Sequence, residues 1–151
     1  MLIPVCGDFV NESTTKEEFK IENETRKILS INCNIMSIAV RIPVSVGHSE
    51  AVFIKIHEEI SQRELIEIYM GYENLIGTGL EVGSSCFPMP INVRNSDRTL
   101  VGRLKVLNGK GNIVALFNCA NNLRVGAATN AIRIARYLIN SSISALKNRM
   151  H

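Results

Sequence analysis

The stretch Thr99-Leu-Val-Gly-Arg-Leu-Lys-Val-Leu-Asn-Gly-Lys-Gly-Asn-Ile-Val-Ala-Leu-Phe-Asn118 predicts a β-hairpin. Apolar and β-branched residues fill two runs, at about 99–107 and 112–118, as is typical of strands. Asn108-Gly109 lies between these runs and favours a type I′ turn, because a type I′ turn needs a positive φ at both central residues. We therefore expect two adjacent antiparallel strands here.

Two further strands are expected upstream of the hairpin. Residues 35–44 are rich in β-branched side chains, which indicates a buried strand, and Pro43 places its end at a sheet edge or a bulge. Gly47 marks a turn, and residues 50–56 then alternate between apolar and polar side chains. The apolar residues that share one face of this second strand are Val52, Ile54 and Ile56.

Two helices are predicted to begin at capping boxes, in which a hydroxyl residue and a glutamate three positions later satisfy each other's backbone amides. Thr15 and Glu18 start a helix over Lys16–Leu29, and Ser61 and Glu64 start one that ends near Gly71. The residues expected to face a core are Phe19, Ile28 and Leu29 in the first helix and Leu65, Ile66, Ile68 and Tyr69 in the second.

A long helix over about 123–146 closes the chain. The order of elements is then helix, two strands, helix, hairpin strands and helix, without an internal repeat. This order predicts an α+β fold with a mixed or mostly antiparallel sheet and helices on one face.

The composition is that of a globular domain. The 151 residues are 46% hydrophobic and 21% charged, and the net charge of +3 is too small to indicate nucleic-acid binding. No apolar run approaches the roughly 18 residues of a membrane span. The four cysteines are widely spaced without a C-x-x-C motif, and the three histidines do not cluster with them, so we expect neither a metal site nor a disulfide framework. A reducing cytoplasm is the expected compartment.

The glycine-rich stretch with Gly77, Gly79 and Gly83 has only a superficial likeness to a dinucleotide loop. Such a loop must open a helix whose first amides face the pyrophosphate. Pro88 and Pro90 make that helix implausible, so we interpret the stretch as an ordinary loop.

Three groups of residues could carry chemistry. Glu17 and Lys20 share a helix face and could point into one site; the alternative is an ordinary solvated helix face. The segment from Arg41 to Glu50 combines an arginine, suited to a carboxylate or phosphate, with a histidine suited to proton transfer; the alternative is a surface turn with weak ion pairs. The segment from Asn122 to Ala131 begins a helix with small residues, which fits either close packing on a sheet or the approach of a cofactor.

Taken together, the sequence resembles aspartate-semialdehyde dehydrogenase through three motifs and their order. The motifs are E-x-x-K-x-x-x-E-T, then R-I-P-V-x-x-G-H-S-E, then N-L-R-x-G-A-A-x-N-A. The resemblance runs from about Thr15 to the closing helix. It implies a catalytic and dimerisation domain similar to that of glyceraldehyde-3-phosphate dehydrogenase, which in the family follows an NADP-binding Rossmann domain. Residues 1–14 would lead in from a missing upstream part, 15–122 would form the catalytic and dimerisation domain, and 123–151 would pack on the missing NADP-binding domain.

The resemblance also implies roles. His48 would be the general acid/base, Arg41 would hold the substrate carboxylate, Glu17 would contact the substrate amino group and Lys20 would help to bind phosphate. The residues implied to lie near the nicotinamide end of NADP are Asn122, Gly126 and Ala127. In the family's reaction a cysteine thiolate attacks aspartate semialdehyde, hydride passes to NADP, and phosphate releases β-aspartyl phosphate; biosynthesis of lysine, threonine and methionine uses the reverse direction.

Neither the Rossmann fingerprint nor the family's Asn-Cys-[Ser/Thr] nucleophile segment is found in this sequence. We therefore expect a C-terminal fragment that depends on a missing N-terminal half, functions as a homodimer or with that half, and is inactive alone because covalent catalysis needs its nucleophile. The alternative is a non-catalytic module, a decayed or solitary dimerisation domain. No nucleic-acid or membrane partner is expected.

Overall fold

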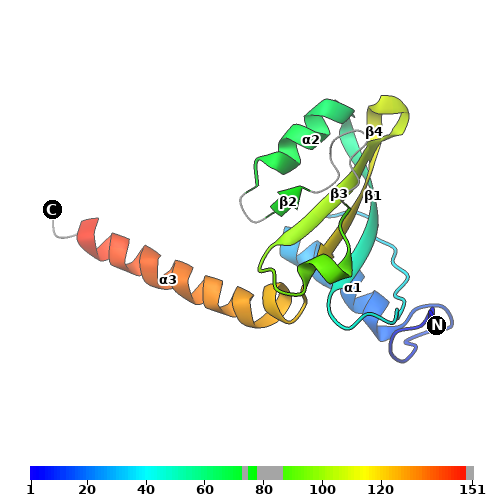
Figure 1. Cartoon of the computed structure of the whole chain (residues 1–151), viewed down its shortest axis with the longest axis horizontal. Helices are drawn as coiled ribbons and strands as arrows, with labels where there is room; N and C mark the ends of the chain where they lie inside the picture. The colour runs from blue at the N-terminus through cyan, green and yellow to red at the C-terminus, as the bar shows by residue number, and fades with distance from the viewer. Residues whose placement is uncertain (73–74, 78–86, 149–151) are drawn as a thin grey trace. The chain divides into compact units, whose positions relative to one another are not determined.

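The chain forms two compact units, Met1–Ser45 and Val46–His151. The computed structural model describes residues 1–72, 75–77 and 87–148, and Figure 1 shows their helices and strands. None of the helices within these ranges is both long and apolar enough to cross a membrane. Apart from Gly77, the glycine-rich stretch discussed above lies largely in 78–86, outside the described residues.

The first unit is built on helix α1, Lys16–Leu29, with the bounds that the capping box predicts. The Thr15 hydroxyl accepts a hydrogen bond from the Glu18 amide, and the Glu18 carboxylate accepts one from the Thr15 amide at 2.8 Å. The helix ends at Ser30, which adopts the left-handed conformation. Both ends of α1 are therefore fixed by local interactions.

The prediction of a strand over residues 35–44 is wrong. This segment forms no ladder, and its backbone makes one isolated antiparallel bridge, between Arg41 and Ile3. The expected apolar face of α1 is also wrong, because Phe19, Ile28 and Leu29 are exposed. Both errors have the same physical reason. The segment after α1, residues 33–41, returns along the helix, and polar side chains of α1 bind the backbone of this returning segment.

The second unit contains a four-stranded sheet in the order β1-β4-β3-β2. Its strands are β1 (His48–Ser61), β2 (Leu75–Gly77), β3 (Thr99–Val106) and β4 (Lys110–Ala120). Strand β4 pairs antiparallel with both β1 and β3, and β2 pairs parallel with β3. This confirms the mixed, mostly antiparallel sheet of the predicted α+β fold, although the short strand β2 was not expected.

The predicted hairpin joins β3 to β4. A short turn, η2 (Leu107–Gly109), connects the strands, with φ of 58° at Asn108 and 76° at Gly109. Both central residues therefore adopt the positive φ that the Asn-Gly dipeptide predicts. Strand β4 is longer than expected because β1 pairs with it from His48–Ala120 as far as Ser61–Lys110.

Helix α2, Gln62–Met70, packs on one face of this sheet and begins at the predicted capping box. The Gln62 side chain also accepts from the Val106 amide and donates to the Leu104 carbonyl, at 2.9 Å each, which fixes the start of α2 to β3. The buried residues between helix and sheet are Leu65, Val101, Leu104, Val106, Val114 and Leu116.

A smaller apolar cluster lies near the other end of the hairpin strands. It joins Val93, at the end of the short helix η1 (Pro90–Val93), to Leu100 of β3 and Cys119 of β4. Val93 and Cys119 are fully buried. This cluster lies beside the start of β1, because Ser49 of that strand pairs with Cys119.

The closing helix begins later than predicted. A π-helical turn, η3 (Arg124–Ala128), precedes α3 (Thr129–Asn148). Large apolar side chains are exposed along α3, among them Ile132, Tyr137 and Leu138. A helix with this surface is typical of one that packs against a further partner.

Candidate functional site

The first unit holds three of the residues implied by the resemblance. Glu17 and Lys20 lie on successive turns of α1, Glu17 half-buried and Lys20 exposed. Arg41 lies at the end of the returning segment, with an exposed side chain. Its amide donates to the Ile3 carbonyl at 2.8 Å and its carbonyl accepts from the Ile3 amide at 3.0 Å. The backbone of Arg41 is therefore held from both sides, while its guanidinium is available to a ligand.

The second unit holds His48, which is exposed at the first position of β1. The residue before it, Gly47, has a φ of +104°, and a Cβ there would approach Val93 Cγ2 to 3.1 Å and the Ala120 carbonyl oxygen to 3.4 Å. Only glycine combines this φ with so little space. The turn that presents His48 therefore depends on the absence of a side chain at position 47.

Asn122 lies next to this turn. Its side-chain oxygen accepts a hydrogen bond from the Gly47 amide at 3.3 Å. Within the described part of the chain, the Asn122 amide nitrogen has no hydrogen-bond partner, which leaves it as a donor for a ligand. The structure thus brings the predicted acid/base residue and one predicted cofactor residue to the same corner of the sheet.

The neighbouring Asn121 fixes the exit of β4 and is buried. It donates to the Arg94 carbonyl at 2.8 Å, and its side-chain oxygen accepts from the Leu123 amide at 3.1 Å. Its own carbonyl accepts from the amides of Arg124 and Val125. Sequence reasoning missed Asn121, although a pair of asparagines just before a helix is a recognisable turn signal.

Gly126 and Ala127 lie in the π-helical turn and are exposed. A Cβ on Gly126 would meet nothing within 4 Å, so a ligand could approach its backbone closely. Asp97 anchors this turn to the loop before β3, since its carboxylate accepts hydrogen bonds from the Arg124 side chain and the Thr129 hydroxyl. The hydrogen bond from Arg124 holds the pKa of Asp97 below its usual range. Asp97 is a second positioning residue that sequence reasoning missed.

Cys119 lies close to this corner but has the character of a structural thiol. Its sulfur is 2.9 Å from the Ser49 hydroxyl, and its side chain is fully buried. Burial raises the pKa of the Cys119 thiol, which disfavours the thiolate that a nucleophile needs. Among the described residues, Cys6, Cys33 and Cys119 are free, and no group of three or more His, Cys, Asp or Glu side chains could hold a metal ion.

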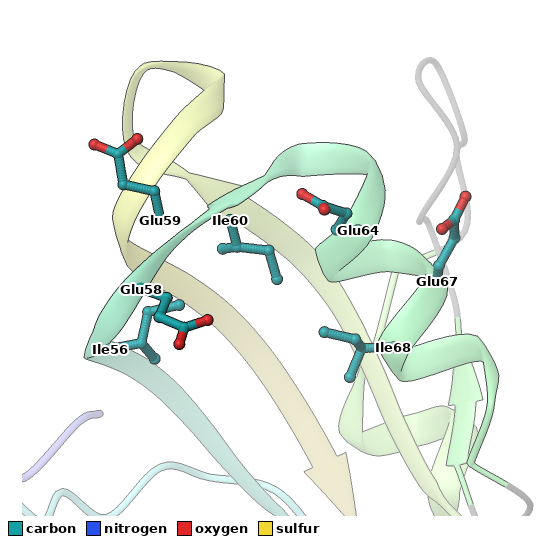
Figure 2. A pocket seen from close by; sticks show the side chains of 7 residues that line it. All are labelled: Ile56, Glu58, Glu59, Ile60, Glu64, Glu67 and Ile68. Carbon is teal, nitrogen blue, oxygen red and sulfur yellow. The ribbon is translucent and has the colours of Figure 1, made fainter.

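A hollow of about 550 Å³ lies elsewhere, between the end of β1 and helix α2. Figure 2 shows its lining of three isoleucines and four glutamates: Ile56, Ile60, Ile68, Glu58, Glu59, Glu64 and Glu67. None of the site residues predicted from the sequence lines it. Glu64 closes the capping box with Ser61, and Glu67 pairs with Arg63 at 2.8 Å. These carboxylates therefore have structural partners already.

Chemically, each unit by itself offers groups that could serve a ligand. The first presents a carboxylate, an ammonium and a guanidinium, which suit an amino group, a phosphate and a carboxylate, respectively. The second presents an imidazole beside a carboxamide and an open stretch of backbone. Cys119, the cysteine near this corner of the second unit, is buried and is not an activated nucleophile.

Comparison with known proteins gives the family of the chain. Residues 2–125 match the family model described as semialdehyde dehydrogenase, dimerisation domain, and the chain belongs to this family. It is 37% identical over 135 residues to an aspartate-semialdehyde dehydrogenase of Campylobacter jejuni, covering 89% of this chain and 39% of the relative. It is 34% identical over 142 residues to the enzyme of the same name from Aquifex aeolicus, covering 93% of this chain and 42% of that relative.

A solved structure gives the same result. The fold matches aspartate semialdehyde dehydrogenase II from Vibrio cholerae, solved as a complex with ASA, with a TM-score of 0.84 and 30% identity. The match covers 93% of this chain and 41% of that one. The chain thus spans about two fifths of the length of the relatives it matches. The predicted family and the predicted fold class are confirmed.

Proposed function

We propose that this chain supplies the acid/base and substrate-binding residues of an NADP-dependent aspartate-semialdehyde dehydrogenase. The observation that carries this proposal is the family match over residues 2–125, combined with the placement of His48 and Asn122 around Gly47. The reaction interconverts aspartate semialdehyde and β-aspartyl phosphate. In the reductive direction it serves the biosynthesis of lysine, threonine and methionine.

Each residue has a role that its side chain can perform. The Arg41 guanidinium holds the substrate carboxylate through paired N–H donors, and Glu17 accepts from the substrate amino group. Lys20 contributes a positive charge for phosphate. His48 accepts and returns a proton at the reacting centre, a role that suits an exposed imidazole at a strand start. The nucleophilic cysteine comes from the other part of the enzyme.

The residues near the C-terminal helix fit NADP. Asn122 has a side-chain nitrogen without a partner among the described residues, and Gly126 leaves open space where a Cβ would point. NADP, when bound, accepts or supplies hydride. Asn122 would orient its nicotinamide end with the free carboxamide donor, while Gly126 and Ala127 would allow close contact with the backbone.

The remaining parts have structural roles in this proposal. Residues 1–14 lead in from an upstream part, and 15–122 form the catalytic and dimerisation domain. Residues 123–151 pack on an NADP-binding domain, for which the exposed Ile132, Tyr137 and Leu138 of α3 supply apolar surface. Leu138→Asp should then weaken co-purification with such a domain, and unchanged co-purification would contradict this assignment.

The homodimer is proposed to form through the sheet face opposite α2. Val52 packs towards the α2 core, so Phe53 points to the other face, where it pairs with Ala115 and is 78% exposed. Ile113 and Phe117 lie in the same row of β4. An exposed apolar surface with a central aromatic side chain is typical of an interface.

This dimer is tested by sedimentation of the 151-residue chain. Phe53→Asp should shift a dimer to monomer, whereas Met70→Asp, also at an exposed apolar position but at the end of α2, should not. A wild-type chain that is monomeric at high concentration would contradict the proposal, as would an equal effect of both substitutions.

The catalytic proposal is tested by complementation. The chain is co-expressed with a polypeptide that carries the Rossmann fold and the Asn-Cys segment, and phosphate-dependent NADPH formation from aspartate semialdehyde is followed. We expect activity only from the combination, and a loss of about 100-fold or more in His48→Ala, in line with the usual contribution of an acid/base residue. A well-folded complex without activity, or full activity in His48→Ala, would favour the alternative of a non-catalytic dimerisation module.

A further inference from the structure

The returning segment of the first unit is attached to α1 by side chains. Glu18, Glu22 and Arg26 lie four positions apart on α1 and therefore share one face of the helix. All three bind groups in the segment from Cys33 to Ala39. These contacts replace the β ladder that the sequence predicts for this segment.

The contacts follow a regular order. Arg26 Nη2 donates to the Ile35 carbonyl at 3.5 Å, and its Nε donates to the Cys33 carbonyl, two positions earlier in the chain, at 2.9 Å. Glu22 Oε1 accepts from the Ser37 amide at 3.0 Å and from its hydroxyl at 3.3 Å. Glu18 Oε1 accepts from the Ala39 amide at 2.9 Å. The segment thus runs antiparallel to α1, and its odd-numbered residues face the helix.

The spacing of the two elements explains why this order works. Four residues of an α-helix rise about 6 Å, and two residues of extended chain advance about 6.6 Å. A row of helix side chains at every fourth position therefore matches a row of backbone groups at every second position. Arg41 is the next residue in the extended row after Ala39, and its backbone is fixed there by Ile3.

We infer that Glu18 and Glu22 are positioning residues for Arg41: they set the register of the segment that carries this guanidinium towards the substrate carboxylate. The inference rests on the proposed function of Arg41. Glu18 has a second task, because its other oxygen, Oε2, caps the helix by accepting from the Thr15 amide at 2.8 Å. Glu22 makes no contact in the capping box, so its substitution separates register from helix capping.

The first test uses the 151-residue chain and amide hydrogen exchange. Glu22→Ala should accelerate exchange at the amides of Ser37 and Arg41 by about tenfold or more, as expected when a hydrogen bond to a charged group is lost. Glu22→Gln keeps an acceptor oxygen and should restore most of the protection. Faster exchange at Ser37 with no change at Arg41 would overturn the inference.

The second test uses the complemented enzyme. Glu22→Ala should raise KM for aspartate semialdehyde about tenfold with little change in kcat, because weakened holding of the carboxylate is a loss of uniform binding. KM for phosphate should stay unchanged. Glu22→Gln should recover most of the affinity. The control is Glu12→Ala, which should match the wild type. It removes an exposed carboxylate that has no hydrogen bond in the described part of the chain.

Arg41→Lys separates failure of the inference from failure of the proposed function. If Arg41→Lys raises KM for the semialdehyde and Glu22→Ala does not, Arg41 binds the carboxylate but Glu22 does not position it. If neither substitution changes KM, the role of Arg41 in substrate binding is wrong, and the positioning inference falls with it even if the exchange data show a coupled register.

Discussion

The side-chain oxygen of Asn122 lies 3.3 Å from the backbone nitrogen of Gly47, across a sequence separation of 75 positions. This hydrogen bond joins the end of β4 to the turn before β1. It therefore connects the residue that we assign to the nicotinamide end of NADP with the turn that presents His48. The contact adds to the pairing of His48 with Ala120 in holding these residues at one corner of the sheet.

Asn122→Ala should lower the free energy of unfolding by about 1 kcal/mol, because the Gly47 amide loses its acceptor. The loss should be seen in urea denaturation followed by far-UV circular dichroism. Asn122→Asp keeps an acceptor oxygen and should lose less stability. Equal losses in both variants would show that the contact with Gly47 contributes little to folding.

Gly47→Ala should be more costly than a substitution at another glycine with positive φ. Gly47 has a φ of +104°, and a Cβ there would lie 3.1 Å from Val93 Cγ2. Gly109 has a φ of +76°, and a Cβ there would meet nothing within 4 Å. Both variants introduce about 1–2 kcal/mol of strain at a positive φ, and only Gly47→Ala adds a steric cost of about 1–3 kcal/mol. Urea unfolding of the two proteins measures the difference. Equal destabilisation would argue against the close packing at Gly47.

The thiols should differ in reactivity. Cys33 is exposed, whereas Cys119 is buried beside Ser49 with a raised pKa. In the native chain at neutral pH, iodoacetamide should modify Cys33 at least about 100-fold faster than Cys119, because Cys119 reacts only after the core opens. Mass spectrometry of peptide digests measures both rates. In urea the two rates should converge, and rapid native labelling of Cys119 would contradict its burial.

The first unit should lose helicity in acid. Hydrogen bonds from the Thr15 and Ala39 amides hold the pKa of Glu18 below its ordinary value. A carboxyl group with a lowered pKa in the folded state contributes stability above its unfolded pKa, and this contribution is lost as the pH falls through the folded pKa. Circular dichroism between about pH 7 and about pH 2 should therefore show a helical signal that falls at the acid end.

Glu18→Gln provides the control for this pH dependence. The variant keeps an acceptor oxygen but removes the ionisable group, so the helical signal in acid should change less than in the wild type. The second capping box contributes to the same transition, since hydrogen bonds from Ser61 lower the pKa of Glu64. The double variant Glu18→Gln, Glu64→Gln should flatten the profile further. An unchanged acid transition in the double variant would contradict the assignment to these carboxylates.

The features that the sequence predicted correctly are local ones. Both capping boxes and the Asn108-Gly109 turn depend on residues within a few positions of one another, and the structure confirms them. Most of the predicted core residues of β1 and α2 also lie in or against the core: Val52, Ile56, Leu65, Ile66 and Tyr69. Ile54 and Ile68 were predicted to face the core as well, and they are exposed. For the capping boxes and the turn, the sequence pattern contains the whole interaction.

The incorrect predictions concern partners that are distant in the sequence. The segment 35–44 has the composition of a strand, but composition does not specify which groups will satisfy its backbone, and here these groups are Glu18, Glu22 and Arg26. Among the candidate site residues, the contact of Asn122 with Gly47 was likewise invisible, because no local pattern connects them.

The attachment of the returning segment has an evolutionary consequence. A β ladder is made of backbone groups, so it survives almost any change of side chain. The segment before Arg41 is instead held by Glu18, Glu22 and Arg26, and a single codon change can remove one of these contacts. The location of Arg41 thus depends on helix residues up to 23 positions away in the chain. Saturation libraries at these positions would explore substrate preference without altering the guanidinium itself.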